Sequence, residues 1–224
     1  MCGRFAMTLP DDAMARLFAA SPANDLPPVP RFNICPTQPI AACTRDPTGR
    51  RYRPLRWGFI PRWYRTPADG PLLINARAES IADKPAFREA VRQRRCLVPA
   101  SGFYEWQKDE AGNRLPWYVT RADGAPMVFA AIWQDWSPPD APGETIPSCA
   151  IVTTAASPDI AHIHHRMPVL IAPDQFGLWL GEQGKGAARL LGPAPEGTLQ
   201  AWRVSRKVNS NRAEGPDLIE PCAD

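Results

Sequence analysis

The sequence lacks the features that mark membrane-spanning, exported and zinc-binding proteins. No apolar run among its 224 residues approaches the roughly 20 that a membrane helix needs, and no apolar signal-peptide stretch stands near the start. It contains no C-x-x-C motif, and its only three histidines are clustered at His162, His164 and His165. We therefore expect no metal, no cofactor and no membrane, and we interpret the six cysteines as reduced thiols of a cytoplasmic protein.

Proline, in contrast, is abundant and scattered. It accounts for 27 of the 224 residues, about 12% against a usual ~5%, which favours short elements joined by rigid turns and argues against a helix bundle. Strands are predicted at residues 38–43, 51–57, 96–99, 102–106, 116–120, 127–134, 149–154 and 201–205. Helices are predicted at 11–20, at 83–94 with Asp83 as N-cap and Pro85 in the first turn, and at 174–181, with surface loops at 22–30 and 137–147. The pattern indicates an α+β fold with a curved or barrel-like sheet, in one domain over 1–224.

The net charge of +3 conceals an asymmetry along the chain. Residues 45–106 carry 13 Lys and Arg against 6 Asp and Glu, whereas residues 107–201 carry 6 against 10. A basic segment built almost wholly from arginine indicates an anionic partner, with nucleic acid as the first candidate. A solvated basic face explains the charge equally well.

The chain start, Met1-Cys2-Gly3-Arg4-Phe5, carries chemistry of its own. A cysteine in the second position normally permits removal of the initiator methionine, which would leave Cys2 with a free α-amine and a thiol on adjacent carbons. An α-amine has a pKa of about 7.7–8.0, so that part of it is a neutral nucleophile at pH 7. Such an aminothiol condenses with an aldehyde to an imine, and the thiol then closes a thiazolidine ring. Cysteine followed by glycine also opens the class II glutamine amidotransferases, in which the thiol attacks an amide.

Polar residues alternate after the apolar run at 72–74. Asn75, Arg77 and Glu79 share one face if the backbone is extended. An amide donates and accepts at once, and a guanidinium forks onto a phosphate. The same spacing also fits the polar face of an ordinary strand.

Glu105 stands among aromatic residues in Gly102-Phe103-Tyr104-Glu105-Trp106. A carboxyl in apolar surroundings has a raised pKa and can act as a general acid or base. An outward-facing glutamate on an alternating strand is the alternative.

Two of the three histidines, His164 and His165, stand beside Arg166 in a predicted loop ahead of Pro168. Histidine suits proton transfer at neutral pH. Because adjacent residues of an extended chain point to opposite sides, we expect only one of the two to face the Cys2 site.

Taken together, these motifs resemble the SOS response-associated peptidase family, whose members are abasic-site processing proteins that shield damaged single-stranded DNA. The resemblance covers nearly the whole chain, in order. It rests on M-C-G-R-F at the start, P-L-L-I-N-A-R-A-E at 71–79, G-F-Y-E-W at 102–106 and I-H-H-R-M-P at 163–168, with shorter matches at 31–36, 57–63 and 204–209. One departure is Trp63-Tyr64, where some relatives carry two tryptophans.

The resemblance implies a mechanism. The Cys2 α-amine attacks the C1′ aldehyde of an abasic site, and the thiol closes the ring to leave a stable DNA–protein crosslink. Asn75 holds the N-terminus and sugar, Glu105 moves protons around the imine, and His164 assists sugar ring opening. The family motif His-x-Arg-Met-Pro assigns the active histidine to His164. Weak strand cleavage and autoproteolytic release are implied as accompanying activities.

The resemblance also implies a DNA-binding surface and a fold. The partner is single-stranded DNA with abasic sites, bound by a monomer without a cofactor. Arg4, Arg77 and Arg166 contact phosphates, Trp63, Tyr64 and Trp106 stack on bases or a duplex end, and Asn33, Pro36 and Thr153 line the groove. The fold is a single α+β domain with a bifurcated, mainly antiparallel sheet, part of it a small closed β-barrel, flanked by short helices.

Two other functions stay open on the residues alone. An amidotransferase would use Cys2 and Gly3 but gives no role to 71–79 or 163–168. A non-enzymatic single-strand-binding module would use the arginines and tryptophans but leaves Cys2 without a function.

Overall fold

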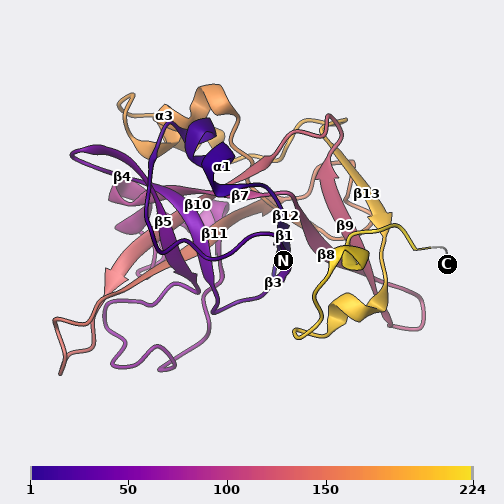
Figure 1. The fold of residues 1–224 in the computed structure, drawn as a ribbon, viewed down its shortest axis with the longest axis horizontal. Coiled ribbons are helices and arrows are strands. Elements are labelled where there is room, and N and C mark those ends of the chain that lie inside the picture. Colours follow the sequence, from indigo (N-terminus) through magenta and orange to yellow (C-terminus); the bar gives the residue numbers. More distant parts are fainter. Residues whose placement is uncertain (1, 223–224) are drawn as a thin grey trace.

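The computed structural model describes residues 2–222 and consists mainly of two sheets, with short helices at their edges (Figure 1). The smaller sheet has the strand order β13 (Leu199–Arg203), β9 (Arg114–Arg121), β8 (Gly102–Lys108), β1 (Phe5–Met7) and β3 (Arg31–Ile34). The larger has the order β12 (Arg166–Pro168), β11 (Ile146–Ala155), β10 (Met127–Trp136), β7 (Arg95–Ala100), β4 (Pro39–Asp46), β5 (Gly49–Trp57) and β2 (Ser21–Pro22), with β6 (Asn75–Arg77) beside β11. The α-helices are α1 (Asp11–Phe18), α2 (Ala90–Gln93) and α3 (Phe176–Leu180), and the 3-10 helices are η1 (Ala78–Ser80), η2 (Pro173–Gln175), η3 (Ala187–Leu190), η4 (Arg206–Asn209) and η5 (Pro216–Leu218).

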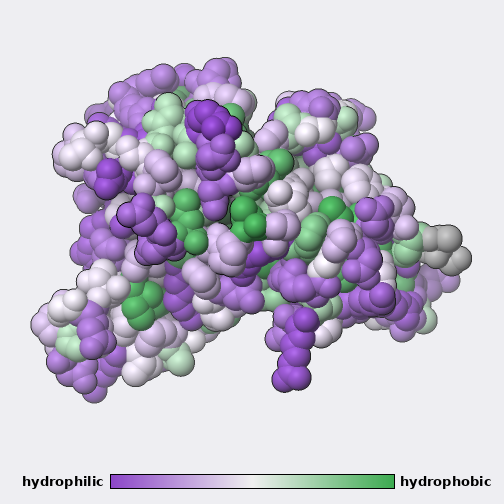
Figure 2. Space-filling model, viewed as in Figure 1, coloured by the Kyte–Doolittle hydropathy of each residue, from purple (hydrophilic) through white to green (hydrophobic). Residues whose placement is uncertain are grey.

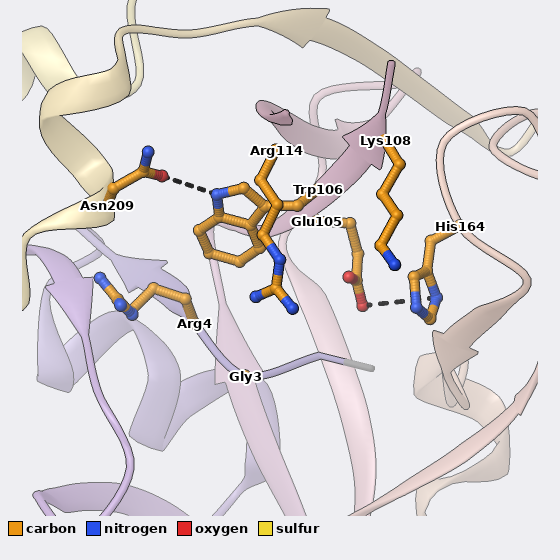
Figure 3. Close-up of a pocket in the computed structure, with 8 residues that line it drawn as sticks. All are labelled: Gly3, Arg4, Glu105, Trp106, Lys108, Arg114, His164 and Asn209. Carbon is orange, nitrogen blue, oxygen red and sulfur yellow. Dashed lines mark hydrogen bonds and ion pairs between the residues drawn. The ribbon is translucent and has the colours of Figure 1, made fainter. Parts of the chain in front are cut away.

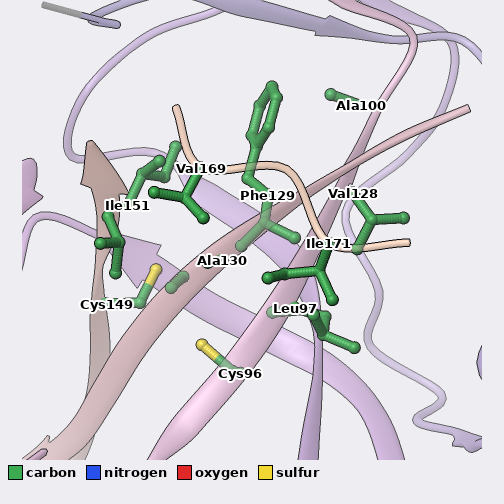
Figure 4. Close-up of a cluster of buried hydrophobic side chains, with 14 of the residues drawn as sticks. Cys96, Leu97, Ala100, Val128, Phe129, Ala130, Cys149, Ile151, Val169 and Ile171 are labelled. Carbon is green, nitrogen blue, oxygen red and sulfur yellow. The ribbon is translucent and has the colours of Figure 1, made fainter. Parts of the chain in front are cut away.

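The larger sheet closes partly into a ring. β11 pairs with β10 on one side and, at Ser148 and Cys149, with Arg56 and Trp57 of β5 on the other. The strands of the ring carry long apolar runs because both of their faces are buried. Phe129, drawn with its buried neighbours in Figure 4, packs against Phe5 and Phe103 of the smaller sheet. The predicted α+β fold with a barrel-like sheet is confirmed.

Strand β11 is also the point at which the sheet divides. Its first half pairs with β10, whereas Val152 and Thr153 pair in parallel with β6, and Thr153 also faces β12. The division brings Asn75 and Arg166, which are far apart in the sequence, to the two sides of one strand.

Strand β1 lies in the interior of the smaller sheet. Phe5 pairs with Ile34 of β3 on one side and with Phe103 of β8 on the other. Its ring is buried against Trp57 and Phe129 of the larger sheet, at centroid distances of 5.2 and 5.9 Å. Residues 2–4 are therefore held where the two sheets meet.

The predicted helix at 83–94 is wrong over most of its length. Only Ala90–Gln93 are helical, and Glu89, rather than Asp83, is the N-cap of this turn. Ile81, Phe87 and Ala90 are buried, and this spacing does not form the continuous apolar stripe of a helix. The helices predicted at 11–20 and 174–181 are confirmed as α1 and as η2 with α3.

Five short strands, β1, β2, β3, β6 and β12, were not predicted as strands, because two to four residues show no measurable periodicity. Within residues 2–222 no helix has the length and apolar character needed to cross a membrane.

Candidate active site

The segment that leads into β1 runs beside β8 and opens onto a pocket. The Tyr104 N–H donates to the Arg4 carbonyl at 2.9 Å, and the register of β1 and β8, continued by two residues, places Gly3 opposite Glu105. The pocket has a volume of about 540 Å³ (Figure 3). It is lined by Gly3, Arg4, Glu105, Trp106, Lys108, Arg114, His164 and Asn209.

Asn75 holds Cys2 from the other sheet. Its Nδ2 donates to the Cys2 carbonyl at 2.8 Å, while its Oδ1 is buried with no hydrogen-bond partner among residues 2–222. Cys2 itself is fully buried. Burial and the nearby Glu105 carboxylate raise the pKa of the Cys2 thiol, so the thiol keeps its proton at neutral pH.

Glu105 and His164 form a pair with opposed pKa shifts. The His164 Nδ1 lies 4.0 Å from the Glu105 Oε1, and the Glu105 side chain is 3% exposed. Burial raises the pKa of Glu105 and lowers the pKa of His164 to about 4. Both shifts favour the uncharged forms, so the pair can pass a proton to or from a bound molecule without holding two charges in a dry site. Across residues 2–222 no three His, Cys, Asp or Glu side chains are grouped as metal ligands.

Of the adjacent histidines, His164 faces the pocket and His165 is exposed. His164 Nδ1 contacts the Arg166 backbone, at 3.0 Å from its N–H and 3.3 Å from its carbonyl oxygen, so Nε2 is the ring nitrogen left to exchange a proton with a bound molecule. The expectation that the two side chains point to opposite sides is wrong, because their rings stack at 4.4 Å and 27°. The chain bends at His165 instead of running extended, so strand alternation does not apply.

Arg166 already has partners on the protein. Its guanidinium binds both carboxylate oxygens of Glu79, at 2.7 and 3.0 Å, and the Thr153 carbonyl at 2.8 Å. Thr153 is fully buried beneath it. This arrangement ties β12, and with it the His164 loop, to β11 and η1.

Arg4 is likewise fixed by the protein. Its Nη1 donates to Asn33 Oδ1 and to the Val208 carbonyl, both at 2.8 Å, and its guanidinium lies 5.8 Å from the centroid of Trp106. Asn33 is buried, and its amide donates to the carbonyls of Ser210 and Ala213. Asn33 therefore lies beneath the pocket and holds Arg4, rather than on its surface.

Comparison with known proteins identifies the family. The model of the SOS response associated peptidase (SRAP) family matches residues 1–211. The chain belongs to the SRAP family. The match spans most of the sequence, whereas the amidotransferase alternative depended on Cys2 and Gly3 alone.

Similar SRAP proteins cover the chain from end to end. The abasic site processing protein YoqW of Bacillus subtilis is 32% identical over 98% of this chain and 99% of its own. YedK of Escherichia coli, with the same description, is 31% identical over 99% and 100%. HMCES of Pongo abelii is 27% identical over 99% of this chain and 76% of its own.

Solved structures show the same fold. A protein from Bacteroides thetaiotaomicron superposes with a TM-score of 0.86 at 24% identity, covering 99% of this chain and 100% of its own. One from Bordetella bronchiseptica gives 0.78 at 28% identity, covering 91% and 100%.

The other residues that the SRAP resemblance implies for DNA binding lie outside the pocket lining. Arg77 is exposed on β6, and Trp63 is 60% exposed in the loop after β5. Tyr64 is half-buried, and its carbonyl accepts from Trp136 Nε1 at 2.9 Å. Pro36 is half-buried in the turn between β3 and β4. Their contacts with DNA stay predictions.

Sequence reasoning missed three residues of the pocket, Lys108, Arg114 and Asn209. Asn209 accepts from Trp106 Nε1 at 2.7 Å, and the SRAP motif at 204–209 contained the only signal for it. Lys108 and Arg114 stand at equal distances from the turn-forming residues between them, which was the available sign that they pair across a hairpin.

Proposed function

We propose that this protein processes abasic sites in single-stranded DNA by forming a covalent thiazolidine crosslink through Cys2. The observation that carries the proposal is the hydrogen bond from Asn75 to the Cys2 carbonyl, next to a pocket where Glu105 and His164 meet. The names of the SRAP relatives, all abasic site processing proteins, support the substrate.

The first steps join the amine to the sugar. Hydrolytic removal of Met1 frees the Cys2 α-amine. An abasic deoxyribose opens when its C1′ hydroxyl loses a proton and its ring oxygen gains one. We assign both transfers to His164, which is neutral at pH 7 because burial lowers its pKa to about 4. The amine then adds to the C1′ aldehyde.

Glu105 and the thiol complete the reaction. The carbinolamine hydroxyl takes a proton from Glu105 and leaves as water, and the nitrogen then returns its own proton to the Glu105 carboxylate, which gives the neutral imine. The thiol sulfur then adds to the imine carbon, and the thiol proton ends on the ring nitrogen. Since the raised pKa of Cys2 keeps its thiol protonated, the amine attacks first and the sulfur acts only once the imine has formed.

Two accompanying activities follow from the same intermediate. An imine at C1′ acidifies the C2′ protons, so β-elimination of the 3′ phosphate gives weak strand cleavage. The site that accepts Cys2 also supports the release of Met1 as an autopeptidase step, with Glu105 and His164 as proton carriers.

Intact-mass analysis after incubation with an abasic oligonucleotide tests the proposal. The expected adduct has the mass of the protein without Met1, plus the oligonucleotide, less one water. Cys2→Ala should bind the strand but lose the heat-stable adduct, while Cys222→Ala, which changes a half-buried thiol elsewhere, should form it normally. A heat-stable adduct from Cys2→Ala, or one that retains Met1, would overturn the mechanism.

A further inference from the structure

Two cations that line the pocket come from opposite strands of the β8–β9 hairpin. Lys108 and Arg114 are direct register partners, the last pair before the turn. The turn is tightly built, because Asp109 accepts both the backbone N–H and the side-chain amide of Asn113, at 2.7 and 2.8 Å. Gly112 occupies the left-handed region there, at φ 81°. The hairpin therefore holds the two cations in a fixed relation.

This pairing is unfavourable for the fold by itself. Like charges directly opposite each other on antiparallel strands destabilise the pair. Neither Lys108 nor Arg114 forms an ion pair or a side-chain hydrogen bond with another residue of the described range 2–222. The adjacent carboxylate of Asp109 is engaged in the turn. A bound anion between the two side chains would offset their repulsion.

Both side chains are exposed and directed toward the reacting groups. They line the same pocket as Glu105 and His164. Figure 3 shows the Lys108 amine extending toward the Glu105–His164 pair and the Arg114 guanidinium lying over Gly3. The pocket lining thus combines two exposed cations with a carboxyl and an imidazole whose pKa shifts favour their uncharged forms.

The other arginines near the pocket are less available. Arg4 is bound to Asn33 and the Val208 carbonyl, and Arg166 is bound to Glu79 in a bidentate pair. A new anion would have to displace those partners, whereas Lys108 and Arg114 have none to lose among the described residues.

We propose that Lys108 and Arg114 clamp the backbone phosphate next to the abasic deoxyribose, an inference that rests on the proposed function. Arginine supplies a fork for two phosphate oxygens and lysine a point charge for a third. With C1′ at the Cys2 amine, the phosphate attached to the same sugar is the anion that must lie at the pocket rim. An inorganic phosphate or a free nucleotide offers the same chemistry, so the source has to be tested.

The first test measures binding of undamaged single-stranded DNA in a Cys2→Ala background, where no crosslink forms. K108Q/R114Q should weaken binding about tenfold at low salt and flatten the log–log salt dependence by about 0.7. K185Q/R189Q removes a lysine and an arginine that are exposed outside the pocket and should change neither quantity. An unchanged salt slope in K108Q/R114Q, or equal losses in both variants, would overturn the clamp.

The second test locates the phosphate. A neutral methylphosphonate placed beside a stable abasic analogue should weaken binding to the Cys2→Ala protein and add nothing in K108Q/R114Q. If inorganic phosphate alone competes with DNA for the site, and more weakly in K108Q/R114Q, while no methylphosphonate position matters, the pair binds free anions and the assignment to DNA is wrong. Because both tests read equilibrium binding and the adduct assay reads chemistry, failure of the clamp and failure of the crosslinking mechanism are distinguishable.

Discussion

Arg166 and Glu79 form a bidentate ion pair across 87 residues of sequence, Nη1 to Oε1 at 2.7 Å and Nη2 to Oε2 at 3.0 Å. The arginine side chain is 11% exposed and the glutamate 54%. The hydrogen bonds from Arg166 hold the pKa of Glu79 below its ordinary value. A carboxylate thus occupies the fork that the predicted DNA phosphate contact of Arg166 would use, and on that prediction the two anions would compete for Arg166.

Replacing the Glu79 carboxylate should remove the competition between Glu79 and a DNA phosphate for Arg166. We expect Glu79→Gln to raise the affinity for undamaged single-stranded DNA about threefold at low salt, since a partly exposed ion pair contributes at most ~1 kcal/mol. Titration of a fluorescent oligonucleotide measures it. Glu144→Gln removes an equally negative side chain from the exposed loop between β10 and β11 and serves as control; equal gains in both variants would mean that Arg166 does not bind DNA.

The two stacked histidines should differ sharply in function. His164→Ala should slow crosslinking by about 10²–10⁴-fold, the usual contribution of a positioned proton carrier, because His164 faces Glu105. His165→Ala removes only the exposed ring and should leave the single-turnover rate within about twofold. A larger loss of rate from His165→Ala than from His164→Ala would show that the assignment of proton transfer to His164 is wrong.

His164 should also impose a pH dependence on stability. Burial lowers its pKa to about 4, below the ~6.5 of an unfolded histidine. Between these values the unfolded chain binds a proton that the folded protein does not, so the free energy of unfolding falls as the pH drops from about 6.5 to 4. Urea titrations over this range should show a shallower fall in His164→Asn and an unchanged one in His165→Asn; equal slopes in all three proteins would show that the buried ring titrates normally.

Substitutions of Asn75 and Asn209 should affect different quantities, the first the rate of crosslinking and the second the affinity for DNA. Asn75→Ala removes the donor to the Cys2 carbonyl and should lower the crosslinking rate at saturating DNA by about tenfold, the usual value of one hydrogen bond. Asn209→Ala removes the acceptor of Trp106 Nε1 and should raise the DNA concentration needed for half-maximal rate instead. Rates measured over a range of oligonucleotide concentrations distinguish the two; the reverse assignment would mean that Asn75 only binds DNA.

The sequence predicts which residues form the candidate site better than it predicts the contacts between them. Of the three residues that were expected together, Glu105 and His164 line one pocket, and Cys2 is buried close enough to Glu105 for that carboxylate to raise the pKa of its thiol. The strand alternation that placed Asn75 and Arg77 on one face ends at Arg77, where η1 begins, and no local pattern shows that Glu79 turns to Arg166.

Other features depend on contacts that periodicity does not encode. The stacking of the histidines depends on a bend at His165, and the loss of the helix at 83–94 depends on which side chains the sheet below can bury. The register of the β8–β9 hairpin, rather than any periodicity of the sequence, makes Lys108 and Arg114 cross-strand neighbours.

The interior position of β1 has a consequence for how the protein matures during synthesis. Phe5 needs Phe103 as its partner, and a ribosome adds about 5–20 residues per second, so the partner strand follows roughly 5–20 s later. During that interval Cys2 has neither its neighbouring strand nor the carboxyl that lines its pocket. Release of Met1 by the proposed autopeptidase step therefore cannot begin until β8, which carries Glu105, has been made and has paired with β1.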